Sequence, residues 1–145
     1  MRLKTNLLTS LAAVAILGCA DAAARELVLI QTNDTHSQID PNDKGFGGIA
    51  RRMAVVDSIR AVHPDALLID SGDAVQGTLF FTIYGGEVEM KMMNELGYDI
   101  AILGNHDFDN GVKPLVKNLA ASNSEWITTN YDLTGSELAS FFKPY

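Results

Sequence analysis

Three short polar clusters each follow an apolar run of the sequence. The clusters are residues 33–36 (NDTH) after the run LVLIQT, residues 71–73 (SGD) after ALLID, and residues 104–107 (GNHD) after DIAIL. Carboxylate, imidazole and amide groups together suit hard or borderline divalent cations. Two such cations held roughly 3.5–4 Å apart can bind a phosphoryl group and generate a nucleophile from water. The clusters therefore predict metal-assisted hydrolysis, provided that the fold brings them together.

Four side chains in these clusters have the types and spacing of metal ligands. Asp34 and His36 are two residues apart, so in an extended segment their side chains point the same way and can bind one ion. Asp73 lies in a turn beside the small Gly72, where a carboxylate can bridge two ions. Asn105 offers a neutral oxygen to the second ion. Each motif alone is typical of an ordinary loop or turn, and the metal interpretation depends on all three together.

His106 can lie near the metal ions without binding them. An imidazole beside a phosphate stabilises developing charge or protonates the leaving oxygen. Its tautomer must be fixed by a partner on the other ring nitrogen. Asp109, three residues further on, has the right spacing for that partner if the chain turns into a helix there. Residues 109–111 are also typical of a turn and helix N-cap, and Asp109 can serve both purposes.

The segments around the clusters alternate between strand and helix patterns. Short apolar runs predict strands, and apolar residues at helical spacing predict helices, one of them closed by Gly97. The expected order is βαβαβαβ, an α/β fold with a mostly parallel sheet whose strands are buried on both faces. Right-handed crossovers would place the polar clusters at one edge of that sheet. The expected strands are residues 26–32, 66–70, 99–103 and 126–129, and the expected helices are residues 47–63, 87–96 and 112–121.

Residues 1–24 have the pattern of a secretory signal peptide. Two basic residues precede an apolar stretch at residues 7–17, which is too short to span a membrane, and small residues follow. Two processing sites compete, because residues 22–24 form a small-x-small site and residues 16–19 resemble a lipobox in which Cys19 would be lipidated. We expect an exported protein of the bacterial periplasm or cell envelope, with membrane contact only through a lipid anchor at Cys19.

The charge and the cysteine content exclude some classes of protein. The chain carries a formal net charge of −7, which is opposite to the balance of a general nucleic-acid binder, so we expect no nucleic-acid partner. The single cysteine excludes an internal disulfide. The length after the signal peptide permits one small domain with a real core.

The clusters also resemble a known family. Residues 29–36 (LIQTNDTH), 72–78 (GDAVQGT) and 104–111 (GNHDFDNG) resemble, in this order, motifs of the metallophosphoesterase (calcineurin-like) superfamily. Residues 47–52 and 128–132 are similar to its branch of exported 5′-nucleotidases, UDP-sugar hydrolases and 2′,3′-cyclic-nucleotide phosphodiesterases. The resemblance implies that the chain after the signal peptide forms a βαβαβαβ half of a four-layer αββα sandwich.

The resemblance implies a role for each residue of the site. Asp73 would bridge two divalent ions, and Asn105 and His106 would also contact the phosphate of the substrate. Zinc, manganese, iron and cobalt are all compatible with these ligands. The implied reaction is attack of a metal-activated water on a nucleotide or related phosphate ester. The implied metal ligands are Asp34, His36, Asp73 and Asn105, and the implied catalytic pair is His106 and Asp109.

Residues 25–145 depart from the family pattern in length. The family completes its metal site with two further histidines and another polar ligand, and it holds the nucleoside in a separate C-terminal domain. Residues 134–145 contain no histidine. We therefore expect a truncated, N-terminal part of a metallophosphoesterase domain that binds metal weakly and hydrolyses little by itself. The alternative is a non-catalytic envelope protein that keeps the scaffold as a binding module, while a nuclease fits the acidic charge poorly.

Overall fold

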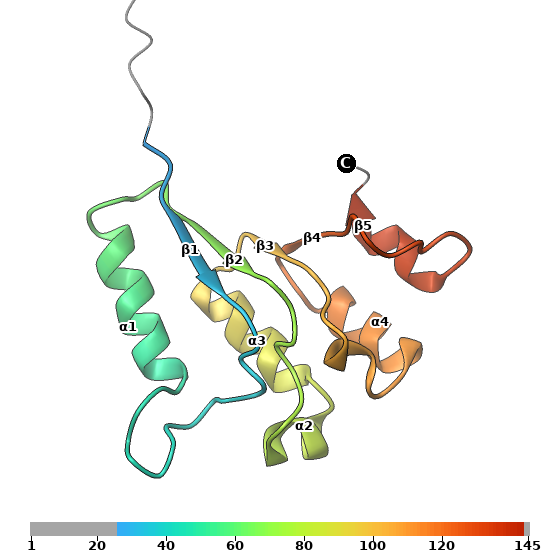
Figure 1. Cartoon of the computed structure of the whole chain (residues 1–145), viewed down its shortest axis with the longest axis horizontal. Coiled ribbons are helices and arrows are strands. Elements are labelled where there is room, and N and C mark those ends of the chain that lie inside the picture. Colours follow the sequence, from blue (N-terminus) through green and yellow to red (C-terminus); the bar gives the residue numbers. More distant parts are fainter. Residues whose placement is uncertain (1–25, 144–145) are drawn as a thin grey trace, which may run out of the picture.

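The protein contains one five-stranded parallel sheet whose strands lie side by side in chain order (Figure 1). The computed structural model describes residues 26–143. The predicted α/β fold with a parallel sheet is confirmed, and a fifth strand extends the expected four. The strands are β1 (Leu29–Thr32), β2 (Leu67–Asp70), β3 (Ile100–Ala101), β4 (Glu125–Ile127) and β5 (Phe142–Lys143).

The predicted signal peptide, with both processing sites and Cys19, lies outside the described residues. Within residues 26–143, no helix is both long enough and apolar enough to cross a membrane. Export and lipid anchoring therefore stay predictions.

Three of the four α-helices found within residues 26–143 follow the helical patterns of the sequence. The third has the predicted bounds because Gly97 ends it in the left-handed conformation, with φ of 68°. The second was not predicted, since its sequence LFFTIY is too short and too uniformly apolar to show helical periodicity; the Thr78 hydroxyl caps it by accepting from the Phe80 amide. The helices are α1 (Ile49–Arg60), α2 (Leu79–Tyr84), α3 (Glu87–Leu96) and α4 (Val112–Ala120), with 3₁₀ turns η1 (His106–Phe108) and η2 (Glu137–Phe141).

The hydrophobic core lies on one face of the sheet. Figure 1 shows α1, α3 and α4 following the order of the strands, as expected when every crossover between sequential parallel strands has the same hand. Val56 of α1, Met93 of α3 and Leu119 of α4 join one cluster with Leu68, Ala101 and Trp126 of the strands. The opposite face differs from the expected burial on both sides, because the paired Ile69 and Ile100 are only half-buried and β1 alternates between exposed and half-buried residues.

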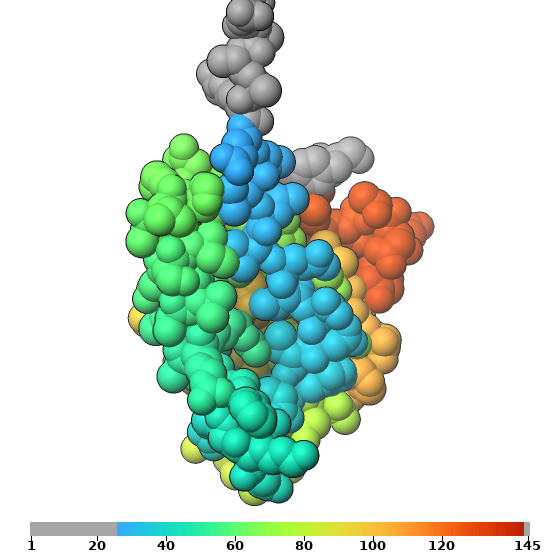
Figure 2. All heavy atoms as spheres, turned by 60° about the vertical axis from the view of Figure 1, so that its left-hand side comes forward, coloured from blue at the N-terminus to red at the C-terminus, as the bar shows by residue number. Residues whose placement is uncertain are grey.

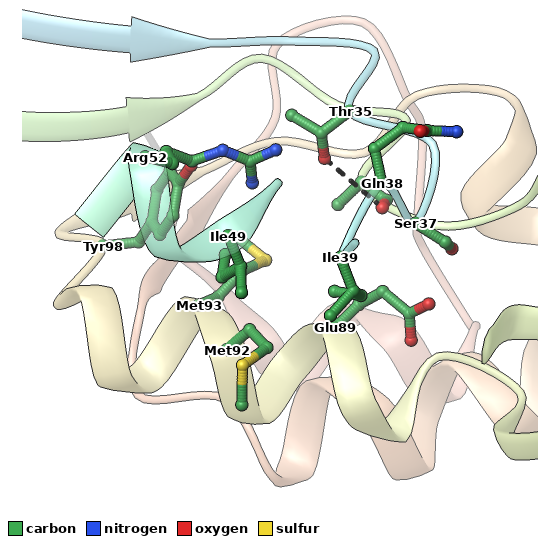
Figure 3. Close-up of a pocket in the computed structure, with 11 residues that line it drawn as sticks. Thr35, Ser37, Gln38, Ile39, Ile49, Arg52, Glu89, Met92, Met93 and Tyr98 are labelled. Carbon is green, nitrogen blue, oxygen red and sulfur yellow. Dashed lines mark hydrogen bonds between the residues drawn. The ribbon is translucent and has the colours of Figure 1, made fainter. Parts of the chain in front are cut away.

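A narrow pocket lies between the β1–α1 connection and α3 (Figure 3). Figure 2 shows that connection, in blue to cyan, on the molecular surface beside α1 in green. Glu89 lines the pocket, and its side chain is buried although the residue is acidic (3% exposed). Neither of its carboxylate oxygens, nor the buried hydroxyl of Ser37 nearby in the same lining, has a hydrogen-bond partner within residues 26–143. A buried carboxylate without partners destabilises a folded chain.

We expect Glu89→Met to stabilise the chain by about 1–3 kcal/mol, because methionine fills a similar volume without unpaired polar atoms. Urea unfolding followed by circular dichroism measures the change. Glu95→Met, at an exposed position of the same helix, serves as the matched control and should change stability by less than about 0.5 kcal/mol. A loss of stability in Glu89→Met would contradict the interpretation.

Candidate metal centre

Three predicted metal ligands lie together at the carboxyl edge of the sheet. Asp34 and His36 follow β1, and Asp73 follows β2. Each offers one ligand atom, and the three atoms lie within 4.8 Å of one another. The Nε2 atom of His36 lies 3.8 Å from Oδ1 of Asp34. Asp73 is buried, whereas Asp34 is exposed, so the cluster opens toward solvent on one side.

The backbone of these three residues adopts the left-handed conformation, which non-glycine residues rarely occupy. The φ angles are 49° at Asp34, 44° at His36 and 55° at Asp73. Such conformations cost roughly 1–3 kcal/mol each and persist only where the surrounding contacts require them. The contacts here are backbone hydrogen bonds between the two loops: the Asp34 amide donates to the Gly72 carbonyl (3.0 Å) and the His36 amide to the Asp73 carbonyl (3.1 Å).

The turn after β2 packs directly against the turn after β3. Gly72 has φ of +97°, and a Cβ atom there would lie 2.6 Å from the Gly104 amide nitrogen. A Cβ atom on Gly104 would collide with the Asp73 carboxylate. The two glycines therefore permit an approach of backbone to backbone that brings the third polar cluster to the first two.

Asp107 joins the two turns, a role that the sequence analysis did not assign. Its Oδ2 atom accepts hydrogen bonds from the Gly104 amide (2.7 Å) and from the Asp73 amide (3.1 Å). Burial raises the pKa of Asp107 to about 6, against the lowering effect of these hydrogen bonds, and the neighbouring Asp73 and Asp70 raise it further. The sequence signal for this role was an aspartate three residues after a glycine that ends a buried strand.

His106 and Asp109 form the predicted pair. His106 Nδ1 lies 2.9 Å from Asp109 Oδ2; His106 is the first residue of η1, and Asp109 directly follows its last residue. This hydrogen bond is the main cause that raises the pKa of His106 above its usual value. The His106 amide donates to Asp73 Oδ1 (2.8 Å), and its ring centroid lies 5.2 Å from that of His36. The third cluster therefore reaches the candidate metal ligands.

Asn105 is exposed at the same edge, between Gly104 and His106. Its side chain makes no hydrogen bond with any other residue of the described chain. Its amide oxygen is thus available to a ligand, and the predicted binding of a second ion by Asn105 stays a prediction.

The donors present fit divalent cations. The cluster combines carboxylates with an imidazole, which suits zinc, manganese, iron or cobalt. The Nε2 atom of His36 faces Asp34, while its Nδ1 atom is buried and has no partner within residues 26–143. A metal-binding histidine normally donates from its second nitrogen, so Nδ1 is where a further contact is needed.

Comparisons with known proteins show what the chain is similar to. A model of the family described as calcineurin-like phosphoesterase matches residues 27–142. The 5′-nucleotidase of Bos taurus is 37% identical over 134 residues, and that of Homo sapiens is 42% identical over 108 residues. These alignments cover 83% and 68% of this chain but 23% and 19% of the relatives, so the chain spans about a fifth to a quarter of their length.

Solved structures show the same similarity. The crystal structure of a 5′-nucleotidase precursor from Thermus thermophilus superposes with a TM-score of 0.76 at 36% identity, covering 82% of this chain and 25% of that one. The NAD nucleotidase of Haemophilus influenzae gives a TM-score of 0.72 at 31% identity, covering 81% of this chain and 23% of that one. The fold described above is therefore shared with about a quarter of each of these longer chains.

Asp109→Asn should lower the pKa of His106 in the metal-free chain, because the variant removes the charge that favours the imidazolium. Titration of the histidine ring protons by NMR measures this value. His63, in the connection between α1 and β2 and outside the site, provides an internal reference in the same spectra. An unchanged His106 titration would show that its pairing with Asp109 is absent in solution.

Asp107→Asn should remove a pH-dependent loss of stability. The folded-state pKa of Asp107, about 6, lies above the ordinary value of 3.8. The contribution of protonated Asp107 to the free energy of unfolding is therefore fully present below about pH 4 and is lost as the pH rises through 6. Asparagine keeps the oxygen that accepts both amides and carries no charge. The metal-free variant should therefore gain about 2 kcal/mol relative to wild type between pH 4 and pH 7. Urea unfolding across this range measures the difference, and a difference that does not vary with pH would contradict the expectation.

Proposed function

Because the chain belongs to the calcineurin-like phosphoesterase family, we propose that it forms the N-terminal part of a metal-dependent hydrolase of nucleotide phosphate esters. The observation that carries this proposal is the convergence of Asp34, His36 and Asp73 beside the His106–Asp109 pair. A scaffold that only bound a partner would have no use for this combination of ligands and a hydrogen-bonded imidazole. The proposal therefore ranks above the non-catalytic binding module.

The nucleotide substrate is supported by the relatives rather than by a nucleoside site in this chain. The curated relatives at 37% and 42% identity are named 5′-nucleotidases. The choice among nucleoside monophosphates, sugar nucleotides and cyclic esters depends on groups that contact the leaving part of the substrate. We propose that these groups correspond to parts of the relatives outside the 23% and 19% of their length that match this chain.

The residues of the site have distinct proposed tasks. Two divalent cations would supply positive charge to the phosphoryl oxygens and make a water molecule nucleophilic at neutral pH. Asp34 and His36 would hold one cation and Asn105 the other, with Asp73 placed to contact both. His106 uses Nδ1 for Asp109, which leaves Nε2 to donate to a phosphoryl oxygen or to the leaving oxygen. Asp109 would hold the tautomer and the orientation of that imidazole.

Four donors shared between two cations leave each cation with fewer ligands than the four to six that such ions usually take. We propose that the remaining ligands come from sequence beyond the region matched here, in line with the greater length of the relatives. The described chain would accordingly bind metal weakly and contribute little turnover by itself. We further propose export of the protein, on the strength of the signal-peptide pattern in residues 1–24.

In a preparation of the protein that releases phosphate, His106→Ala should lower phosphate release from a nucleoside monophosphate by about 10²–10⁴-fold with metal content nearly unchanged. Asp73→Ala should lose metal and turnover together, because it removes a carboxylate that both cations would share. Phosphate release in the presence of Mn²⁺ or Zn²⁺ and elemental analysis measure the two properties. His63→Ala, in the connection between α1 and β2 away from the site, is the matched histidine control. Loss of metal from His106→Ala would refute its assignment as a group that acts on the substrate.

A further inference from the structure

Asp70, the last residue of β2, is a buried carboxylate with both oxygens engaged. It is 1% exposed, and neither the resemblance nor the site above gives it a task. Its Oδ2 atom accepts from the Thr32 hydroxyl at the end of β1 (2.6 Å), and its Oδ1 atom accepts from the Gly72 amide (3.0 Å). One side chain therefore joins the carboxyl ends of two neighbouring strands at the point where the ligand loops begin.

The hydrogen bonds continue from Asp70 into the helical layer. The Thr32 hydroxyl lies 2.7 Å from the hydroxyl of Tyr98, which is buried. Burial raises the pKa of Tyr98, and the positive charge of Arg52 on α1 opposes this effect. Figure 3 shows Arg52 and Tyr98 side by side at one end of the pocket. Burial raises the pKa of Asp70, while the positive charge of Arg52 opposes this effect. The carboxylate is thus linked through Thr32 and Tyr98 to a cation on α1.

On its other side Asp70 reaches two of the candidate metal ligands through Gly72. The Gly72 amide is held by Asp70, and the Gly72 carbonyl accepts from the Asp34 amide (3.0 Å). Asp73 follows Gly72 directly in the chain. Asp34 and Asp73 both need external contacts to keep their left-handed backbone, with φ of 49° and 55°. Both candidate ligands therefore depend on how the peptide groups on either side of Gly72 are oriented.

We propose that Asp70 is a positioning residue that fixes the Gly72 turn and through it sets Asp34 and Asp73 in their ligating arrangement. It is not itself a ligand, since it is buried and its two oxygens are occupied by Thr32 and Gly72. The part of this inference that concerns metal affinity rests on the proposed function. The part that concerns how firmly the two loops are held in place does not rest on it, and it applies to the chain without metal.

The test compares Asp70→Ala with Asp70→Asn in the full chain. Alanine removes both acceptors, whereas asparagine can accept from Gly72 and donate to Thr32. In the metal-free chain, Asp70→Ala should speed amide hydrogen exchange at Gly72 and Asp34 by about ten-fold or more, with α4 amides unchanged. It should also weaken Co²⁺ binding, followed by visible absorption, by about 10–100-fold. Asp70→Asn should restore both properties to within about three-fold of wild type.

Asp99 supplies the matched control. Its carboxylate likewise accepts from a backbone amide, that of Leu68 (2.8 Å), but Asp99 precedes β3 and so lies at the opposite edge of the sheet. Asp99→Ala should therefore leave exchange at Gly72 and Asp34 and the Co²⁺ affinity unchanged. If Asp70→Ala does not fold, Thr32→Val, which removes the hydroxyl between Asp70 and Tyr98, should still speed exchange at Gly72 by about three-fold.

The proposal would be overturned if Asp70→Ala exchanged its Gly72 and Asp34 amides at the wild-type rate. It would also be overturned if the α4 amides exchanged faster by the same factor, because this would show a general loss of stability. Exchange is measured without metal and decides the inference by itself. Co²⁺ binding that Asp73→Ala leaves unchanged would instead count against the proposed function.

Discussion

The close approach of the turns after β2 and β3 is the constraint on which the candidate site depends. The backbones at Gly72 and Gly104 approach so closely that no side chain fits between the two turns. The Asp107 carboxylate accepts one hydrogen bond from a backbone amide of each turn, those of Asp73 and Gly104. This contact holds Asp73 in an unfavourable backbone conformation and places its carboxylate against the His106 amide. Sheet topology brings the strand ends to one edge. The glycines and Asp107 then hold the loops after these strands close enough for their polar side chains to lie within a few ångströms of one another.

The same constraint concentrates negative charge in a partly buried volume. Asp70, Asp73 and Asp107 are all buried, and the charges of Asp70 and Asp73 both raise the pKa of Asp107. Without a compensating cation, this arrangement opposes folding at neutral pH, because desolvation and mutual repulsion disfavour the ionised carboxylates. A divalent cation bound at Asp34, His36 and Asp73 would reverse the sign of the local electrostatics. The energetic cost in the free chain and the proposed affinity for cations would thus have one cause.

The sequence predicted the parts of this structure that depend on local patterns. Apolar runs followed by polar clusters located three strand ends, and Gly97 located the end of α3. Contacts between distant segments were not predictable in the same way. Asp70 and Asp107 resemble ordinary turn aspartates until the neighbouring turn is in place, and the left-handed backbone at Asp34 and Asp73 depends on hydrogen bonds across loops. The two-residue β5 and the aperiodic α2 carry too little pattern to be recognised.

The hydrogen bond between Asp73 and His106 depends on the side chain of Asp73 but only on the backbone of His106. Asp73 Oδ1 accepts from the backbone amide of His106, so the orientation of this carboxylate is fixed before any cation binds. Loss of the Asp73 side chain would therefore disturb the candidate ligands and the start of η1 together. Loss of the His106 imidazole would leave the amide and the Asp73 contact in place, because the ring makes its own hydrogen bond to Asp109. This asymmetry would allow the proposed cation binding and the proposed action on a substrate to be separated experimentally, although the two groups are in contact.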